Sequence, residues 1–211
     1  MGLFQRRSET GTSTPLYTLS AQKNILIVGL GNVGKQYNRT RHNVGFECID
    51  AFAHHNNFPS WIEKKDLKCY LTKQLLGDTT VILIKPSTYM NLSGEAVQAV
   101  QHYYKLAASA IMVVHDDVDV TFGAIRTKFG GGDAGHNGLK SIIQYSGNDF
   151  YRIRIGIANE KMSNIPLENF VLMAFSGEEQ DKMPLIYKQA NSILKQFIEQ
   201  GSIEPSTIQV Q

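Results

Sequence analysis

The sequence has few cysteines, no long apolar run and almost no excess of charge, and each shortage excludes a class of protein. Cys48 and Cys69 are the two cysteines among 211 residues, and their spacing matches no metal motif. We therefore expect free thiols in a reducing compartment. No apolar stretch approaches the roughly 20 residues of a membrane helix. Because the formal net charge is only +2, a nucleic-acid site would have to be a local patch.

What is present fits an ordinary globular protein, with 42% hydrophobic and 19% charged residues. A chain of this length can bury a sizeable core as one domain. We expect a poorly structured polar extension over residues 1–22, one domain over 23–201 and a loose tail over 202–211.

Apolar periodicity alternates between strand and helix along the chain. Strands are predicted at residues 24–28, 67–75, 80–84, 111–114, 124–129 and 151–157. Helices are predicted at residues 44–55, 92–105, 138–146 and 176–201. Gly77-Asp78 predicts a hairpin turn, Ser176 to Glu179 a capping box, and Pro184 a kink or restart of the last helix. This order predicts an α/β fold: a single three-layer domain whose twisted, mixed and mostly parallel sheet carries helices on both faces.

A glycine motif after the first strand suggests a dinucleotide site. Gly29-Leu-Gly-Asn-Val-Gly34 matches G-x-G-x-x-G, but that motif needs a helix that begins within the glycines and meets the pyrophosphate. Here a polar loop follows, and the helical pattern begins only near Val44. The acid at a suitable distance, Asp50, falls inside a helix. The pattern therefore disfavours a nucleotide cofactor.

Two polar residues far apart in the sequence can form a catalytic pair. His42 stands where the polar loop becomes a helix, and Asp116 follows the apolar strand 111–114. Strand ends can face each other across the crevice of an open α/β sheet. A carboxylate there can fix the imidazole tautomer and leave the other nitrogen as a base. The alternatives are a surface histidine, or a metal site that adds His115 and Asp119.

Three asparagines, Asn32, Asn91 and Asn137, stand at strand or helix ends. Taken singly, each has a structural explanation, because asparagine favours turns and helix N-caps.

The motifs together carry a resemblance. In order, the chain contains GLGNVG, RHNVG, TYMNLSG, HDDVD, GGGDAGHNGLK and RIRIGI between about Asn24 and Phe175. This set resembles bacterial-type peptidyl-tRNA hydrolase. The resemblance implies metal-free hydrolysis of the ester between a peptide and the 3′ ribose of tRNA, without a cofactor. It implies that His42 activates water, that Asp116 orients it, and that Asn32, Asn91 and Asn137 hold the peptidyl part and the water.

The resemblance also implies binding residues around that centre. Further substrate-binding residues would be Tyr37, Met90, Gly135 and His136. Arg126 and Lys128 alternate onto one face of their strand and match a basic pair that clamps the tRNA 5′ phosphate, with Arg152 extending the patch. Loops 130–135 and 159–170 would flank the cleft.

The sequence departs from the family pattern at three places. Val33 stands where proline is common, Thr121-Phe122 replace Pro-Pro, and Ala158-Asn159-Glu160 replace Gly-basic-Pro. The last removes a positive charge near loop 159–170.

We expect a cytoplasmic monomer that acts on peptidyl-tRNA and has no membrane partner. The alternatives are a non-catalytic RNA-binding relative and a NAD-type oxidoreductase.

Overall fold

The structure is a computed structural model that describes residues 23–210. The predicted extension, residues 1–22, lies outside the described residues. In the described part of the chain, no helix is long and apolar enough to cross a membrane.

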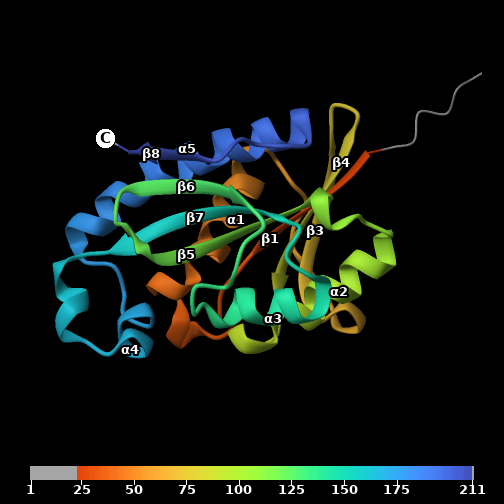
Figure 1. Cartoon of the computed structure of the whole chain (residues 1–211). Helices are drawn as coiled ribbons and strands as arrows, with labels where there is room; N and C mark the ends of the chain where they lie inside the picture. Colours follow the sequence, from red (N-terminus) through yellow and green to blue (C-terminus); the bar gives the residue numbers. More distant parts are fainter. Residues whose placement is uncertain (1–22, 211) are drawn as a thin grey trace, which may run out of the picture.

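One eight-stranded sheet organises the described chain, in the order β2-β3-β4-β1-β5-β7-β6-β8 (Figure 1). Its strands are β1 (Lys23–Gly29), β2 (Ile62–Lys64), β3 (Cys69–Leu76), β4 (Thr79–Pro86), β5 (Ile111–Thr121), β6 (Ala124–Phe129), β7 (Tyr151–Ala158) and β8 (Ser206–Gln209). The four central strands, β4, β1, β5 and β7, are parallel. The outer pairings are antiparallel. The mixed sheet is as predicted, but "mostly parallel" holds only for the centre, because hairpin strands and the chain's end extend both edges.

Helices cover both faces of the sheet, so the three-layer prediction is confirmed (Figure 1). The helices are α1 (Val44–His55), α2 (Ser93–Tyr104), α3 (Asn137–Ser146), α4 (Leu167–Val171) and α5 (Gly177–Gln200). On one face, Phe52 of α1 and Phe197 of α5 pack with Ile27 of β1. On the other, Val97 of α2 and Ile142 of α3 pack with alternate strand residues. This is the two-sided burial that a continuous apolar strand such as β1 predicts.

Short 3₁₀ helices occupy several connections. They are η1 (Lys35–Tyr37), η2 (Arg41–Asn43), η3 (Lys65–Leu67), η4 (Met90–Leu92), η5 (Ala108–Ala110) and η6 (Glu160–Asn164). The hairpin at Gly77, whose φ is 58°, joins β3 and β4 as predicted. The capping box at Ser176 is also confirmed. Pro184 lies inside α5, which does not restart there.

The prediction of a loose tail after Gly201 is wrong. Residues Ser206–Gln209 form β8, which pairs antiparallel with β6. Ile203 is buried in the core and Ile208 packs against it. Val210 packs against the core as well, and Ser206 exchanges hydrogen bonds with Thr127, so apolar contacts and strand pairing together hold the tail. Strand β2 was not predicted either, because all three of its residues are exposed and carry no apolar alternation.

Strand β5 is longer than its apolar run, and this places the functional residues. Its pairing with β1 ends where Gly29 meets Val114. The strand then continues through His115 and Asp116 beside β7 alone. Asp116 therefore stands beyond the carboxyl end of β1, where the order of strands reverses and ligands bind in open α/β sheets.

Candidate active site

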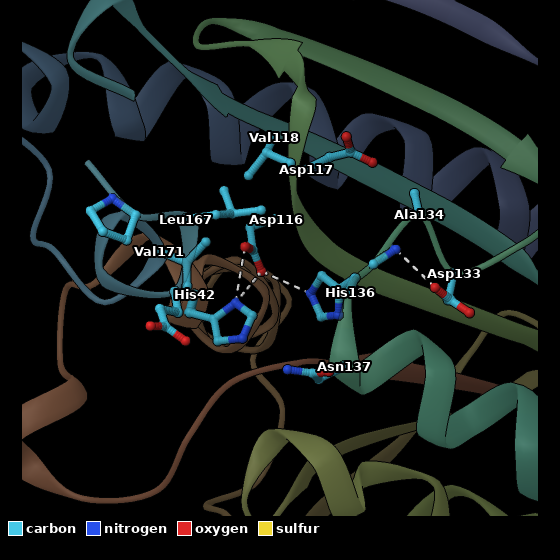
Figure 2. A pocket seen from close by; sticks show the side chains of 13 residues that line it. His42, Asp116, Asp117, Val118, Asp133, Ala134, His136, Asn137, Leu167 and Val171 are labelled. Carbon is cyan, nitrogen blue, oxygen red and sulfur yellow. Dashed lines mark hydrogen bonds and ion pairs between the residues drawn. The ribbon is translucent and has the colours of Figure 1, made fainter. Parts of the chain in front are cut away.

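His42 and Asp116 meet as predicted (Figure 2). The Nδ1 atom of His42 lies 3.0 Å from both carboxylate oxygens of Asp116. His42 is 9% and Asp116 1% exposed, so the contact is shielded from water. When neutral His42 donates from Nδ1, its Nε2 carries the free lone pair. Within the described chain, Nε2 has no hydrogen-bond partner. It is therefore available to a substrate or a water molecule.

A close approach of backbones holds His42 in this place. His42 lies in η2, directly before α1. A Cβ atom on Gly45, in the first turn of α1, would collide with the Val114 carbonyl oxygen and lie 2.6 Å from the Leu30 backbone nitrogen. Only glycine lets α1 pack this tightly against β5, and that packing brings the preceding turn to Asp116.

His136 is a second partner of Asp116, a role that the sequence did not predict. Its Nε2 lies 3.0 Å from Oδ1 of Asp116. Its Nδ1 accepts from the backbone N–H groups of Gly138 and Leu139 and so caps α3. Because Nδ1 is an acceptor, Nε2 must carry the proton and donate to Asp116. The sequence predicted a substrate-binding role for His136, which its place in the lining of the cleft still allows. The sequence His136-Asn137-Gly138 directly before a predicted helix could have indicated this helix cap.

His115 completes a row of three imidazoles. Its ring lies edge-on to His136, with centroids 5.0 Å apart, and His136 lies 5.0 Å from His42. His115 Nδ1 contacts the Asp116 carbonyl oxygen at 2.6 Å. Burial, followed by repulsion from His136, lowers the pKa of His115 to about 3 despite the attraction of Asp117 and Asp116. His115 is therefore neutral at physiological pH.

The contact between His42 and Asp116 shifts the pKa values of the two side chains in opposite directions. Burial lowers the pKa of His42, but the charge of Asp116 and its hydrogen bond outweigh this, so the pKa of His42 is raised. Burial would raise the pKa of Asp116, but His42 and His136 lower it well below the usual range. Asp116 therefore stays ionised, and His42 is a stronger base than a free imidazole.

The three predicted asparagines do not share one wall. Asn32 is buried, and its Oδ1 accepts from the backbone N–H of Met90. Asn43 in turn holds the backbone of Asn32 through both ends of its side-chain amide. No role was predicted for Asn43, although it lies inside a motif. Asn91 is exposed and lies outside the lining of the cleft. Asn137 lines the cleft, and Figure 2 shows its side chain pointing toward the His42 ring.

A cleft of about 380 Å³ opens on the pair. His42, Asp116 and His136 form its polar floor. Its other lining residues are Asp117, Val118, Asp133, Ala134, Gly135, Asn137, Pro166, Leu167, Glu168 and Val171. Segments 130–135 and 159–170 flank the cleft as predicted, with Gly135 on one side and α4 on the other. The second segment is not a plain loop as expected, because it contains η6 and most of α4. Tyr37 and Met90 do not line it.

The predicted basic patch separates into exposed and buried members. Arg126 and Lys128 are exposed on β6, opposite Arg154 and Arg152 of β7. Arg154 binds Asp117 at 2.6 Å. Arg152 is only 3% exposed, and it donates to the carbonyl oxygens of Gly131 and Gly132. The prediction that Arg152 extends the phosphate patch is therefore not supported, because its charge holds the glycine-rich loop instead.

The geometry bears on two alternative sites, a metal site and a dinucleotide site. Ligand atoms of His42, Asp116 and His136 lie within 4.8 Å of one another, so these three residues could also hold a metal ion. The metal alternative of the sequence included His115 and Asp119, which are not in this cluster. The glycine motif is followed by the three-residue 3₁₀ helix η1, and α1 begins only at Val44, so no α-helix starts within the glycines as a dinucleotide site requires. Asp50 lies inside α1, as predicted.

An α/β sheet with a buried carboxylate and an imidazole at its switch point, facing a cleft, defines a protein equipped for acid–base chemistry. Residues 26–211 match the family described as peptidyl-tRNA hydrolase. The chain therefore belongs to the peptidyl-tRNA hydrolase family.

Individual relatives agree. The chain is 44% identical over 168 residues to the peptidyl-tRNA hydrolase of Wolbachia sp. subsp. Brugia malayi, covering 80% of this chain and 90% of that protein. It is 43% identical over 181 residues to that of Wolinella succinogenes, covering 85% and 90%. The crystal structure of peptidyl-tRNA hydrolase from Acinetobacter baumannii superposes with a TM-score of 0.77 at 34% identity, covering 85% of this chain and 90% of that one.

Proposed function

We propose that this protein hydrolyses the ester bond between a peptide, or an N-blocked aminoacyl group, and the 3′ ribose of tRNA, and so recycles peptidyl-tRNA that ribosomes release. The observation that carries the proposal is the buried His42–Asp116 pair at the floor of a cleft, in a member of this family. We further propose that the protein acts in the cytoplasm as a monomer, without metal or cofactor.

The proposed reaction uses His42 as a general base. Nε2 removes a proton from water as the water oxygen bonds to the ester carbonyl carbon. The tetrahedral intermediate then collapses, the bond from carbon to the ribose oxygen breaks, and the proton passes from His42 to that oxygen. Asp116 fixes the tautomer and stabilises the imidazolium that forms between the two steps. A carboxylic acid and a free tRNA 3′ end leave the site.

The amides near His42 suit a substrate of variable sequence. Asn137 can both donate and accept, so it can pair with peptide backbone whatever the side chains are. A free aminoacyl-tRNA presents an ammonium where a peptide presents an amide, which would leave such a group poorly paired. Asn32 lies outside the lining of the cleft, where its Oδ1 accepts from the backbone N–H of Met90. We retain Asn91, Tyr37 and Gly135 as proposed contacts of a longer peptide.

The tRNA would contact the outer face of β6. Arg126 and Lys128 alternate outward there and are exposed. They can bind the tRNA 5′ phosphate without reading base sequence. The peptide end would then enter the cleft between the glycine-rich loop and α4.

The direct test mixes the protein with an N-blocked aminoacyl-tRNA, such as diacetyl-lysyl-tRNA, in EDTA. We expect the blocked amino acid to be released at the same rate with EDTA as without it. Activity that EDTA abolishes and a divalent metal restores would instead favour a metal held by His42, Asp116 and His136. Binding of tRNA without release would favour the non-catalytic relative.

The variant His42→Ala tests the role of His42 in the same assay. A general base contributes roughly 10²–10⁴-fold, so we expect a loss of turnover of about that size with tRNA binding retained. His55→Ala is the control, because His55 is exposed and lies outside the cleft. Near-normal turnover in His42→Ala would refute the proposed role.

A further inference from the structure

One wall of the cleft is fastened to the turn that carries His42. Leu167 and Val171 of α4 line the cleft. The chain after α4 runs back beside η2, where Thr40 bridges to Ala174. The backbone N–H of Arg41 donates to the Met173 carbonyl oxygen at 3.0 Å. The wall and the proposed base therefore share one local attachment.

The side chain of Arg41 adds contacts to α4 and to the chain that follows it. It is 2% exposed, although it lies next to His42 in sequence. Its guanidinium lies 4.6 Å from the ring centroid of Phe170, on α4, and 5.0 Å from that of Phe175. It also donates to the carbonyl oxygens of Met173 and Ala174. A cation this deeply buried needs a countercharge.

Glu179 supplies the countercharge and joins two further segments. Its Oε2 lies 2.6 Å from Nη2 of Arg41 and also accepts from the backbone N–H of Ser176. Its Oε1 accepts from Nδ2 of Asn159 at 2.7 Å. Asn159 leads into η6, and its Oδ1 accepts from the Lys161 N–H. Glu179 thus connects both ends of the segment that carries α4, residues 159–176, to the turn beside His42.

We propose that Arg41, Glu179 and Asn159 form a clasp that positions the α4 wall of the cleft against His42. They are positioning residues: none of them lines the cleft, and they act on the peptidyl group through Leu167 and Val171. Asn159 belongs to the stretch where this sequence departs from the family pattern, and here it supplies a hydrogen bond to Glu179. The inference rests on the proposed function, because it assigns the cleft to the peptidyl group.

Glu179 also closes the capping box of α5, and a suitable variant separates that duty from the clasp. Glutamine satisfies the third position of a capping box as glutamate does, so Glu179→Gln keeps the cap but removes the charge that faces Arg41. Asn159→Asp keeps an acceptor for the Lys161 N–H but places a second carboxylate against Glu179. Glu178→Gln is the matched control: Glu178 is exposed in the same first turn and has no side-chain partner among the described residues.

The experiment measures kcat, KM and backbone hydrogen exchange on the full chain. In Glu179→Gln and Asn159→Asp we expect KM for N-blocked aminoacyl-tRNA to rise roughly threefold to tenfold with kcat within about twofold. The acid limb of kcat/KM should stay in place, because the His42–Asp116 contact is intact. Amides of α4 should exchange faster than in wild type, and those of α3 should not. In Arg41→Lys we expect KM to lie between that of the wild type and that of Glu179→Gln. Lysine keeps the positive charge but loses the planar set of guanidinium donors.

The two hypotheses fail in different ways. KM and α4 exchange equal to those of Glu178→Gln in both variants would overturn the clasp while leaving the proposed function intact. A wild-type protein without hydrolytic activity would overturn the function, and α4 exchange would then decide the clasp alone. If Glu179→Gln does not fold, Asn159→Asp carries the test, because Asn159 is only partly buried.

Discussion

His136 ties the start of α3 to Asp116, with Nε2 of the histidine 3.0 Å from Oδ1 of the carboxylate. Because the helix N–H groups occupy Nδ1 of the same ring, the direction of this hydrogen bond is fixed. Asp116 therefore accepts from two imidazoles, and of these two only that of His42 keeps a nitrogen without a protein partner within the described chain. The geometry thus makes His136 a helix cap and a donor to Asp116, two contacts that the predicted substrate-binding role did not include.

His136 variants test the separation of cap and donor. His136→Asn should keep α3 capped, since asparagine is a good N-cap, but should lose the hydrogen bond to Asp116. A hydrogen bond to a charged group is worth about 1.5–3 kcal/mol, so kcat should fall about tenfold or more. His136→Ala should lose kcat similarly and about 1 kcal/mol of stability in addition. Chemical denaturation and steady-state kinetics on both variants decide; a kcat for His136→Asn equal to wild type contradicts the donor role.

The activity of the wild-type protein should rise with pH. The base must be neutral, and Asp116 raises the pKa of His42 from 6.5, so kcat/KM should reach half its maximum above pH 6.5. In Asp116→Ala only burial remains, which lowers the pKa of His42. The acid limb should therefore move to lower pH. A full pH profile of kcat/KM for both proteins is the measurement, and an acid limb unmoved in Asp116→Ala would mean that another group titrates.

Asp116→Ala should also be less damaging than His42→Ala, because the first change costs orientation and the second removes the base. Both variants are compared at the pH optimum of each, so that the shift in pKa does not mask the difference. If the order of severity were reversed, Asp116 rather than His42 would be the group that acts on water.

Charge on β6 should govern affinity for tRNA. Replacing Arg126 and Lys128 together by alanine should raise KM and reduce the slope of log affinity against log salt by roughly 0.7–0.9 for each phosphate that the protein no longer neutralises. The control replaces Lys64 and Lys65, which are exposed at the β2 edge of the sheet. Titrations at several salt concentrations give the slopes. If only the control variant changed the slope, the phosphate site would lie at the β2 edge and not on β6.

Buried His115 should make the fold sensitive to acid. Its pKa is about 3 in the folded protein against 6.5 unfolded, so the unfolded state binds the extra proton. The contribution of His115 to the free energy of unfolding is fully present above pH 6.5. It falls as pH drops toward 3, by up to roughly 1.4 kcal/mol per pH unit. The pKa of His42 is raised, so its contribution to the free energy of unfolding is lost only as pH rises above 6.5. It therefore does not change between pH 3 and pH 6.5, where His115 titrates. Denaturation from pH 6.5 to 4.5 should show a flatter decline for His115→Gln; a parallel decline would assign the proton to another group.

The sequence by itself determined the alternation of strands and helices, the two-sided burial of β1 and the hairpin at Gly77, because these follow from local patterns. For His42 and Asp116 it predicted a possible pair and left a surface histidine and a metal site as alternatives. It also determined that Arg126 and Lys128 face outward, since side chains alternate along a strand.

Only the tertiary structure decided what each polar side chain contacts. Arg152 shares its strand face with Arg154, yet one holds a loop and the other an aspartate, because their partners come from distant segments. His136 became a helix cap, Asn32 turned to Met90, and the polar tail joined the sheet as β8. Periodicity specifies which face a residue occupies, but hydrogen bonds depend on the approach of elements that are remote in sequence, and that approach is set by packing of the whole core.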